Sequence, residues 1–118
     1  MKVKKGVIMH ISKWMFMCLL LGGCSAPERL EMKENAVLID VRSMEEYQSS
    51  FIPGAVNIPH TEIGEKIVAV APEKDTPLYL YCRSGRRVGI AMEILKKLGY
   101  SDMVNLGGYE EAKEKLQK

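Results

Sequence analysis

The sequence predicts an α/β domain with a mostly parallel sheet flanked by helices. Short runs of β-branched and aliphatic residues alternate with segments of helical spacing over about 80 residues. Parallel strands this short need crossover helices between them, and the order of the segments supplies those helices. The composition, with 47% hydrophobic and 27% charged residues among 118, fits one small globular domain and excludes disordered and collagen-like chains.

A strand and a short helix open the pattern. Residues 37–41 are aliphatic apart from one aspartate, which is typical of a strand buried on both faces. Ser43 and Glu46 have the spacing of a capping box, so a short helix is expected to begin there. Pro53 and Gly54 then predict a turn.

A very short second strand and a second helix are expected next. Residues 55–58 have strand character and are stopped by Pro59. Residues 61–70 carry apolar side chains at positions 63, 67, 68 and 70, which is a helical spacing, although Gly64 weakens it. Residues 72–77 are polar and predict a loop.

The clearest strand and helix follow this loop. Residues 78–81 predict a strand that leads to Cys82, and residues 88–98 predict a helix with Gly99 just after its C-terminus. One face of that helix is expected to be apolar and to carry Ile90, Ala91, Ile94, Leu95 and Leu98. A last strand is expected at residues 103–106, before a pair of glycines and a charged C-terminal helix.

The N-terminal segment differs from the rest of the chain. Residues 1–23 carry four lysines and no acidic residue, whereas residues 24–118 carry 13 basic and 15 acidic side chains. The basic start, whether translation begins at Met1 or Met9, leads into an apolar run over residues 14–21 that is too short to span a bilayer. We therefore predict an export signal, with an uncleaved anchor or a disordered tail as the alternatives. The basic charge belongs to this segment, so no nucleic-acid binding is expected.

Residues 21–24, with the sequence Leu-Gly-Gly-Cys, resemble the lipobox of bacterial lipoproteins. In such proteins the cysteine is lipidated and becomes the new N-terminus after cleavage. We therefore expect a signal peptide over residues 1–23, a lipidated Cys24 with a polar tether to residue 36, and one domain over residues 37–118. The protein would be exported and held by its lipid in the periplasm or at the outer face of the cell membrane.

Three cysteines have different expected fates. Cys18 would leave with the signal and Cys24 would be blocked by lipid, so Cys82 remains as the sole free thiol. A lone cysteine is ordinarily buried and inert. We expect no cofactor and no metal site, because the mature chain keeps one histidine, His60, and one thiol without a metal-ligand spacing.

The surroundings of Cys82 favour a catalytic loop. Ligands of open α/β sheets bind beyond the carboxyl ends of the strands, and Cys82 stands at such an end, just before a helix. Amides at a helix start, a glycine that allows a tight curve and three arginines suit a bound anion and favour thiolate over thiol. These loop residues are Arg83, Ser84, Gly85, Arg86 and Arg87. A solvated surface loop is the alternative for the arginines, and phosphatases use the same arrangement, so the residues indicate a nucleophile and an anion but not the reaction.

Five ordered motifs resemble the rhodanese family, and small single-domain periplasmic members of the phage-shock type above all. The motifs are residues 38–42, 46–47, 52–59, 81–87 and 106–108. The resemblance implies a compact rhodanese-like fold and thiosulfate sulfurtransferase activity. Cys82 would take sulfur from thiosulfate or another anionic sulfane-sulfur donor as a persulfide, and a thiol, cyanide or a protein would accept it. Backbone amides of residues 83–87 would cradle the persulfide and the anionic donor. Arg83, Arg86 or both would attract the donor, and Arg87 would position the loop more than bind substrate.

Loop length separates the branches of this family. In rhodanese-fold phosphatases and arsenate reductases, the cysteine loop is one residue longer than in the sulfurtransferases. The six-residue loop formed by residues 82–87 therefore favours sulfur transfer. A sulfur carrier or persulfide-binding partner domain without turnover is the alternative, followed by a phosphatase or arsenate reductase. Phe51 departs from the histidine that is common in the family. Asp40 and Arg42 are interpreted as strand-end residues of opposite charge that hold neighbouring loops.

Overall fold

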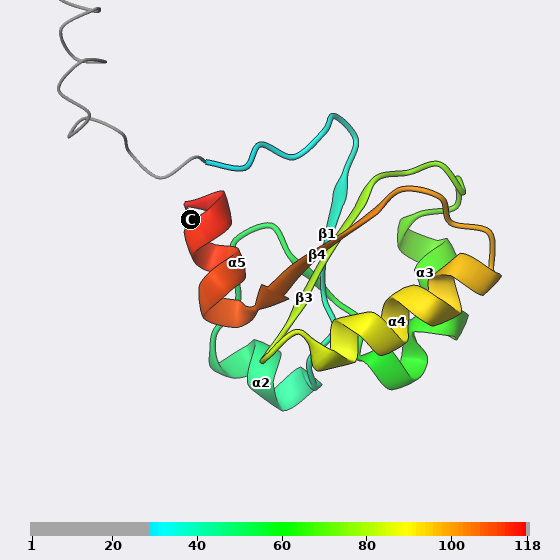
Figure 1. Ribbon diagram of the computed structural model, residues 1–118. Helices are drawn as coiled ribbons and strands as arrows, with labels where there is room; N and C mark the ends of the chain where they lie inside the picture. Colours follow the sequence, from blue (N-terminus) through cyan, green and yellow to red (C-terminus); the bar gives the residue numbers. More distant parts are fainter. Residues whose placement is uncertain (1–28, 118) are drawn as a thin grey trace, which may run out of the picture.

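The structure, a computed structural model, describes residues 29–117 (Figure 1). The predicted signal peptide and Cys24 lie outside these residues. Four parallel strands form one sheet in the order β2-β1-β3-β4, which confirms the predicted α/β class. The strands are β1 (Val37–Asp40), β2 (Val56–Asn57), β3 (Leu78–Cys82) and β4 (Met103–Gly108). The helices are α2 (Met44–Ser49), the 3₁₀ turn η1 (His60–Glu62), α3 (Ile63–Val70), α4 (Arg86–Lys97) and α5 (Tyr109–Leu116).

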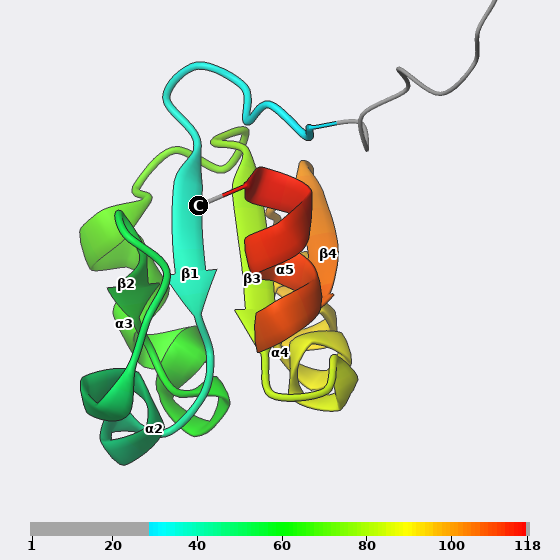
Figure 2. The same ribbon diagram turned by 90° about the vertical axis from the view of Figure 1, so that its left-hand side faces the viewer.

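Helices cover both faces of the sheet, with α5 on one side and α3 and α4 on the other (Figure 2). Every residue of β3 is buried, because its side chains alternate between these two layers. Leu78, Leu80 and Cys82 belong to the cluster that includes α3 and α4, whereas Tyr79 and Tyr81 belong to the cluster that includes α5. The sheet thus has two cores, and Cys82 faces the one beneath α4.

The packing of α4 corrects the predicted apolar face. Its buried residues are Val88, Ala91 and Leu95, whereas Ile90 and Leu98 are each 40% exposed. A helix that lies on a sheet buries a narrow stripe at spacings of three and four residues, and Ile90 lies off that stripe. Leu98 continues the spacing but is the C-cap residue, beyond the end of α4. The helix also begins two residues earlier than predicted, inside the arginine loop.

Gly64 has a packing role in α3. A Cβ atom at this position would lie 3.3 Å from the Ile94 side chain, so the absence of one lets α3 approach α4 closely. The predicted helix is therefore confirmed despite its glycine, although its first residues form η1.

The capping box that the sequence predicts is formed at α2. The Glu46 N–H donates to the Ser43 hydroxyl at 3.2 Å, and the Ser43 N–H donates to the Glu46 carboxylate at 3.1 Å. The predicted turn follows the helix, where Gly54 has a φ of 91°.

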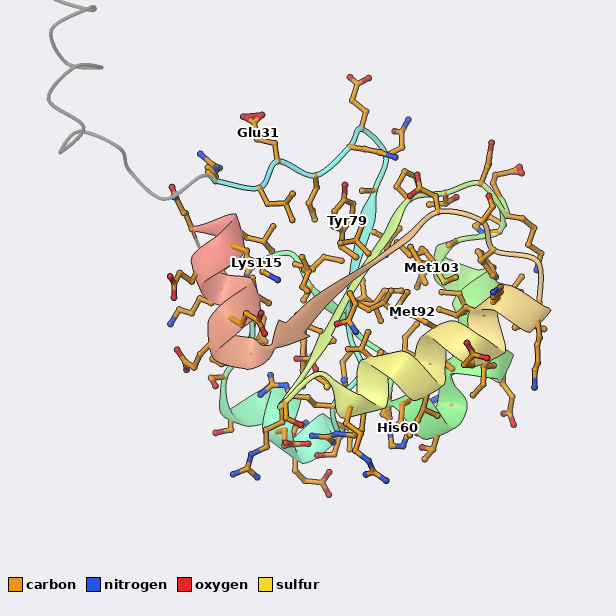
Figure 3. The ribbon with its side chains drawn as sticks, in the orientation of Figure 1. Glu31, His60, Tyr79, Met92, Met103 and Lys115 are labelled. Atoms are coloured by element: carbon orange, nitrogen blue, oxygen red, sulfur yellow. The ribbon has the colours of Figure 1, made fainter. Side chains whose placement is uncertain are left out.

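Residues 29–36, here called the N-terminal strap, pack on the α5 side of the domain. Leu30 and Met32 contact the second core cluster, and the Leu30 N–H donates to the Lys115 carbonyl at 2.8 Å. Tyr79 points toward the strap (Figure 3), and its hydroxyl accepts the Lys33 N–H at 3.2 Å. The strap is therefore part of the packed domain, although its polar composition predicts a tether. Within the described residues, none of the helices has the length and apolar character needed to cross a bilayer.

Candidate active site

Cys82 ends β3 and lies opposite Gly108 of β4, just past an irregularity in the strand register. Its side chain has no exposed surface. The Sγ atom accepts the N–H of Gly85 at 2.8 Å, which bends the chain back over the sulfur. The sequence prediction of a cysteine at a strand end, directly before a helix, is confirmed in this geometry.

Gly85 also begins α4. As the N-cap residue it has a φ of 95°, a left-handed conformation that glycine adopts without steric cost. The first turns of α2 and α5 each contain two glutamates, whereas the first turn of α4 contains no acidic residue. No carboxylate in the first turn therefore neutralises the positive N-terminus of α4, which can attract an anion near the sulfur.

The loop residues differ in exposure. Arg83, Ser84 and Arg86 are exposed, whereas Gly85 and Arg87 are half-buried. Of these loop residues, Arg83 and Ser84 line a cleft of about 800 Å³. The other lining residues come from the ends of β1 and β4 and from the regions of α2 and α5: Arg42, Glu45, Glu46, Ser49, Ser50, Gly108, Tyr109, Glu110 and Glu111. The cleft is thus bounded on one side by Arg83 and Ser84 of the cysteine loop.

Arg87 is held away from the solvent by Glu46 of α2. Its Nη1 and Nη2 atoms donate to the two carboxylate oxygens at 2.8 and 3.1 Å. The bonds from Arg87, supported by the Ser43 N–H, lower the pKa of Glu46 to about 2, and the same pair raises the pKa of Arg87. This bidentate pair fits the predicted loop-positioning role of Arg87.

The glycine pair, predicted to follow the last strand, instead forms the end of β4 and lets the loop lie against this strand. A Cβ atom on Gly108 would lie 2.5 Å from the Arg83 carbonyl oxygen and 3.4 Å from the Ser84 Cα. At Gly107 the reason for glycine is the backbone conformation, since its φ of 86° lies in the left-handed region. The Gly108 N–H donates to Glu111 of α5 and lowers the pKa of that carboxyl group, so the same corner also caps a helix.

Asp40 and Arg42 form a buried pair beside the site. The Arg42 Nε lies 2.9 and 3.0 Å from the two carboxylate oxygens, and its Nη2 donates to Asp40 and to the Ser50 carbonyl at 2.6 Å each. Burial opposes the charge of Arg42, but Asp40 outweighs it and raises the Arg42 pKa. The guanidinium also lies over the Tyr109 ring at 4.7 Å. The predicted structural role is confirmed, since the pair joins β1 to the end of α2.

Sequence reasoning missed the partner of Arg87 and the reason for the glycine pair. Glu46 has a visible signal as a capping residue, but the bond to Arg87 spans 41 positions and has no local pattern. Gly107 and Gly108 are visible as a pair, but their contact with the cysteine loop depends on the order of strands. Among residues 29–117, no group of three or more metal-ligating side chains lies together.

A buried sulfur that accepts an amide hydrogen bond, at an uncompensated helix N-terminus beside two exposed arginines, suits a thiolate nucleophile that acts on an anion. Comparisons with known proteins narrow this chemistry. The thiosulfate sulfurtransferase PspE of Escherichia coli (strain K12) is 42% identical over 73 residues, which cover 62% of this chain and 70% of that protein. YrkF of Bacillus subtilis (strain 168), whose name proposes a sulfur carrier, is 37% identical over 79 residues, or 67% of this chain and 42% of that protein.

A solved structure described as rhodanese with anions from E. coli superposes with a TM-score of 0.62 at 41% identity, covering 64% of this chain and 89% of that one. The family model that matches is the rhodanese-like domain, over residues 25–115. This match includes the N-terminal strap as well as the sheet and helices. The chain therefore belongs to the family of rhodanese-like domains.

Proposed function

We propose that this protein transfers sulfane sulfur from thiosulfate, or a similar anionic donor, to a thiophilic acceptor through a persulfide on Cys82. The observation that carries the proposal is the hydrogen bond from Gly85 to the Cys82 sulfur at the acid-free N-terminus of α4. This arrangement places a nucleophilic sulfur where an anionic substrate is favoured. The similarity to a thiosulfate sulfurtransferase supports the choice of donor.

The reaction would proceed in two steps. The Cys82 thiolate attacks the outer sulfur of thiosulfate, a new sulfur–sulfur bond forms, and the old bond breaks with its electron pair leaving on sulfite. An acceptor thiolate or cyanide then attacks the outer sulfur of the persulfide, and Cys82 leaves as a thiolate. Both steps are displacements on sulfur and need no cofactor.

Different groups of the loop would contribute to binding of the donor. Amides at the start of α4 would face the anionic donor, and Arg83 and Arg86 would add positive charge at the exposed side of the loop. Ser84 and Gly85 complete the six-residue turn. The related E. coli structure is described as rhodanese with anions, which supports an anionic ligand for this protein too.

The test is an intact-mass measurement after incubation with thiosulfate. The wild-type domain is expected to gain one sulfur atom and to release one equivalent of sulfite, and cyanide should remove the added sulfur as thiocyanate. The Cys82→Ser variant should do none of these. A wild-type protein that never gains the sulfur would refute the proposal.

A sulfur carrier is the second candidate, because YrkF is also similar to this chain. The same measurement separates the two functions. A persulfide that forms stoichiometrically but is not discharged by cyanide or small thiols, and is discharged by a protein acceptor, would favour the carrier. Repeated turnover with small acceptors would favour the enzyme.

The location of the protein is a separate proposal. The signal segment and lipobox support export with a lipid on Cys24, so the domain would work outside the cytoplasm, in the periplasm or at the outer face of the membrane.

A further inference from the structure

Glu46 connects the cap of α2 with the cysteine loop. Its carboxylate accepts two bonds from Arg87, at 2.8 and 3.1 Å, and a third from the Ser43 N–H at 3.1 Å. The side chains of Glu46 and Arg87 are 27% and 24% exposed, so water screens their pairing only in part. The carboxylate is thus fixed beside the loop and remains ionised at neutral pH.

This pairing changes the effective charge of the loop. Among the described residues, Arg83 and Arg86 form no ion pair, whereas Arg87 is matched by Glu46. Arg87 interacts electrostatically with Cys82, so its charge reaches the sulfur. The loop therefore presents two uncompensated cations to a bound anion and one compensated cation.

We propose that Glu46 sets the anion affinity of the cysteine loop by neutralising Arg87, so that the sulfite formed in the first step is held weakly and leaves. The inference rests on the proposed function for the identity of that anion. A third uncompensated cation would bind thiosulfate more tightly, but it would also retain sulfite in the position that the acceptor must enter. Glu46 is therefore a positioning residue that acts through Arg87.

The variant Glu46→Gln separates charge from structure. Glutamine serves in a capping box as glutamate does, so the bond to Ser43 and the start of α2 are retained. In a Cys82→Ser background no sulfur is transferred, and calorimetric titration then measures binding of thiosulfate and of sulfite directly. Loss of the carboxylate charge should tighten both affinities by about three- to tenfold at low salt.

Two controls match the change in charge. Glu45→Gln alters the neighbouring carboxylate, which lines the same cleft without bonding to the loop, and Glu93→Gln alters an exposed residue on α4. Each should change the affinities by less than about twofold. Adding Arg87→Gln to the Glu46→Gln variant removes the cation that Glu46 had neutralised, so the gain in affinity should be lost.

Kinetics of the protein with Cys82 intact supply the second readout. In Glu46→Gln the thiosulfate KM should fall, sulfite should inhibit more strongly, and kcat should fall because sulfite leaves slowly. Unchanged or weaker anion binding would overturn the inference, as would an equal gain in Glu45→Gln or a gain that survives Arg87→Gln. A wild-type protein that binds anions but forms no persulfide would instead refute the proposed function.

Discussion

Gly108 is the residue at which the last strand touches the cysteine loop. Its φ of −80° is open to any amino acid, so the need for glycine is one of space alone. The atom in the way of a side chain is the Arg83 carbonyl oxygen, a backbone atom that moves only with the loop. The position of the loop over Cys82 thus depends on the absence of a side chain in a different strand.

Gly108→Ala is therefore expected to displace the loop. The clash should cost about 1–3 kcal/mol of unfolding free energy and slow persulfide formation by at least about tenfold. The matched control is Gly89→Ala on α4, where a Cβ atom would meet nothing within 4 Å. This control should gain about 0.5–1 kcal/mol from helix propensity and load sulfur at the wild-type rate. Urea unfolding and the rate of mass gain measure both effects, and equal behaviour of the two variants would contradict the steric explanation.

Single residues were predictable from sequence where their signal is local. Cys82 stands out because a strand, a glycine and a helix surround it within a few positions. The partner of Arg87 and the neighbour of Gly108 were not predictable in this way. Both depend on contacts between segments that are distant in the chain, which one sequence does not encode as a pattern.

Helix α2 shows how one element serves two purposes. Its capping box is an ordinary local structure, and the same glutamate that closes the box holds Arg87 of α4. The folded-state pKa of Glu46, about 2, lies below its ordinary value of 4.5. A carboxyl group whose pKa falls on folding stabilises the protein above its unfolded pKa, and this stabilisation is lost as the pH drops toward the folded pKa.

The unfolding free energy of Glu46→Gln should therefore depend on pH in a characteristic way. Above about pH 5 the wild type should be more stable than the variant by about 1–2 kcal/mol, a modest value because both side chains are partly exposed. The gap should close between pH 4.5 and about 2, as the Glu46 carboxylate is protonated in both folded and unfolded states. Denaturant titrations across this range provide the measurement, with Glu93→Gln as the control that shows no such gap. A difference that persists at pH 2 would indicate a packing effect instead.

Most elements were predictable because their signals repeat along the chain. The strands, the capping box and the turn at Gly54 have local patterns, and all are present in the structure. The exposure of Ile90 and Leu98 was not predictable in this way. Both residues are apolar, and the sequence does not indicate how wide or how long the buried stripe of α4 is. Tertiary packing decides which of several apolar residues in a helix face the sheet.

At the scale of the whole molecule, the N-terminal strap completes the second core. Leu30, Met32 and Ala36 pack beside α5, and the Lys33 side chain bonds to Asp102 at 2.9 Å just before β4. The polar composition of residues 25–36 concealed this packing, because only a few apolar side chains carry it. The sheet face that α5 leaves open is thus covered by the segment that precedes β1.

Removal of the strap is expected to weaken the domain. A chain that begins at Val37 should lose about 2–4 kcal/mol of unfolding free energy relative to a chain that begins at Arg29. The shorter chain no longer buries Leu30 and Met32 on folding, and the core surface that they cover becomes exposed to water. Urea unfolding of the two chains measures the difference. Equal midpoints and slopes would mean that the strap contributes no stability and that the earlier boundary at residue 37 suffices.

The strap and the cysteine loop lie at opposite ends of the sheet (Figure 1). The strap contacts Lys115 near the end of α5 and Tyr79 near the start of β3, whereas Cys82 ends β3 and the cleft reaches the first turn of α5. Cys24 precedes Arg29 by five residues, which span at most about 18 Å when fully extended. A lipid on Cys24 would therefore keep the domain near the membrane at its strap end, and the cysteine loop would be at the end that faces away.

This orientation leads to a prediction about the anchored protein. Cys24→Ala should release the protein from the membrane fraction or leave an unprocessed precursor, because no acyl group can be attached. The anchored wild type and the released variant should nevertheless gain sulfur from thiosulfate at rates within about twofold, since diffusion of a small anion to the far end is unhindered. Fractionation followed by intact-mass analysis measures both properties. Wild-type protein that is exported but recovered free of membranes would refute the lipid anchor, and anchored protein that loads sulfur much more slowly would refute the orientation.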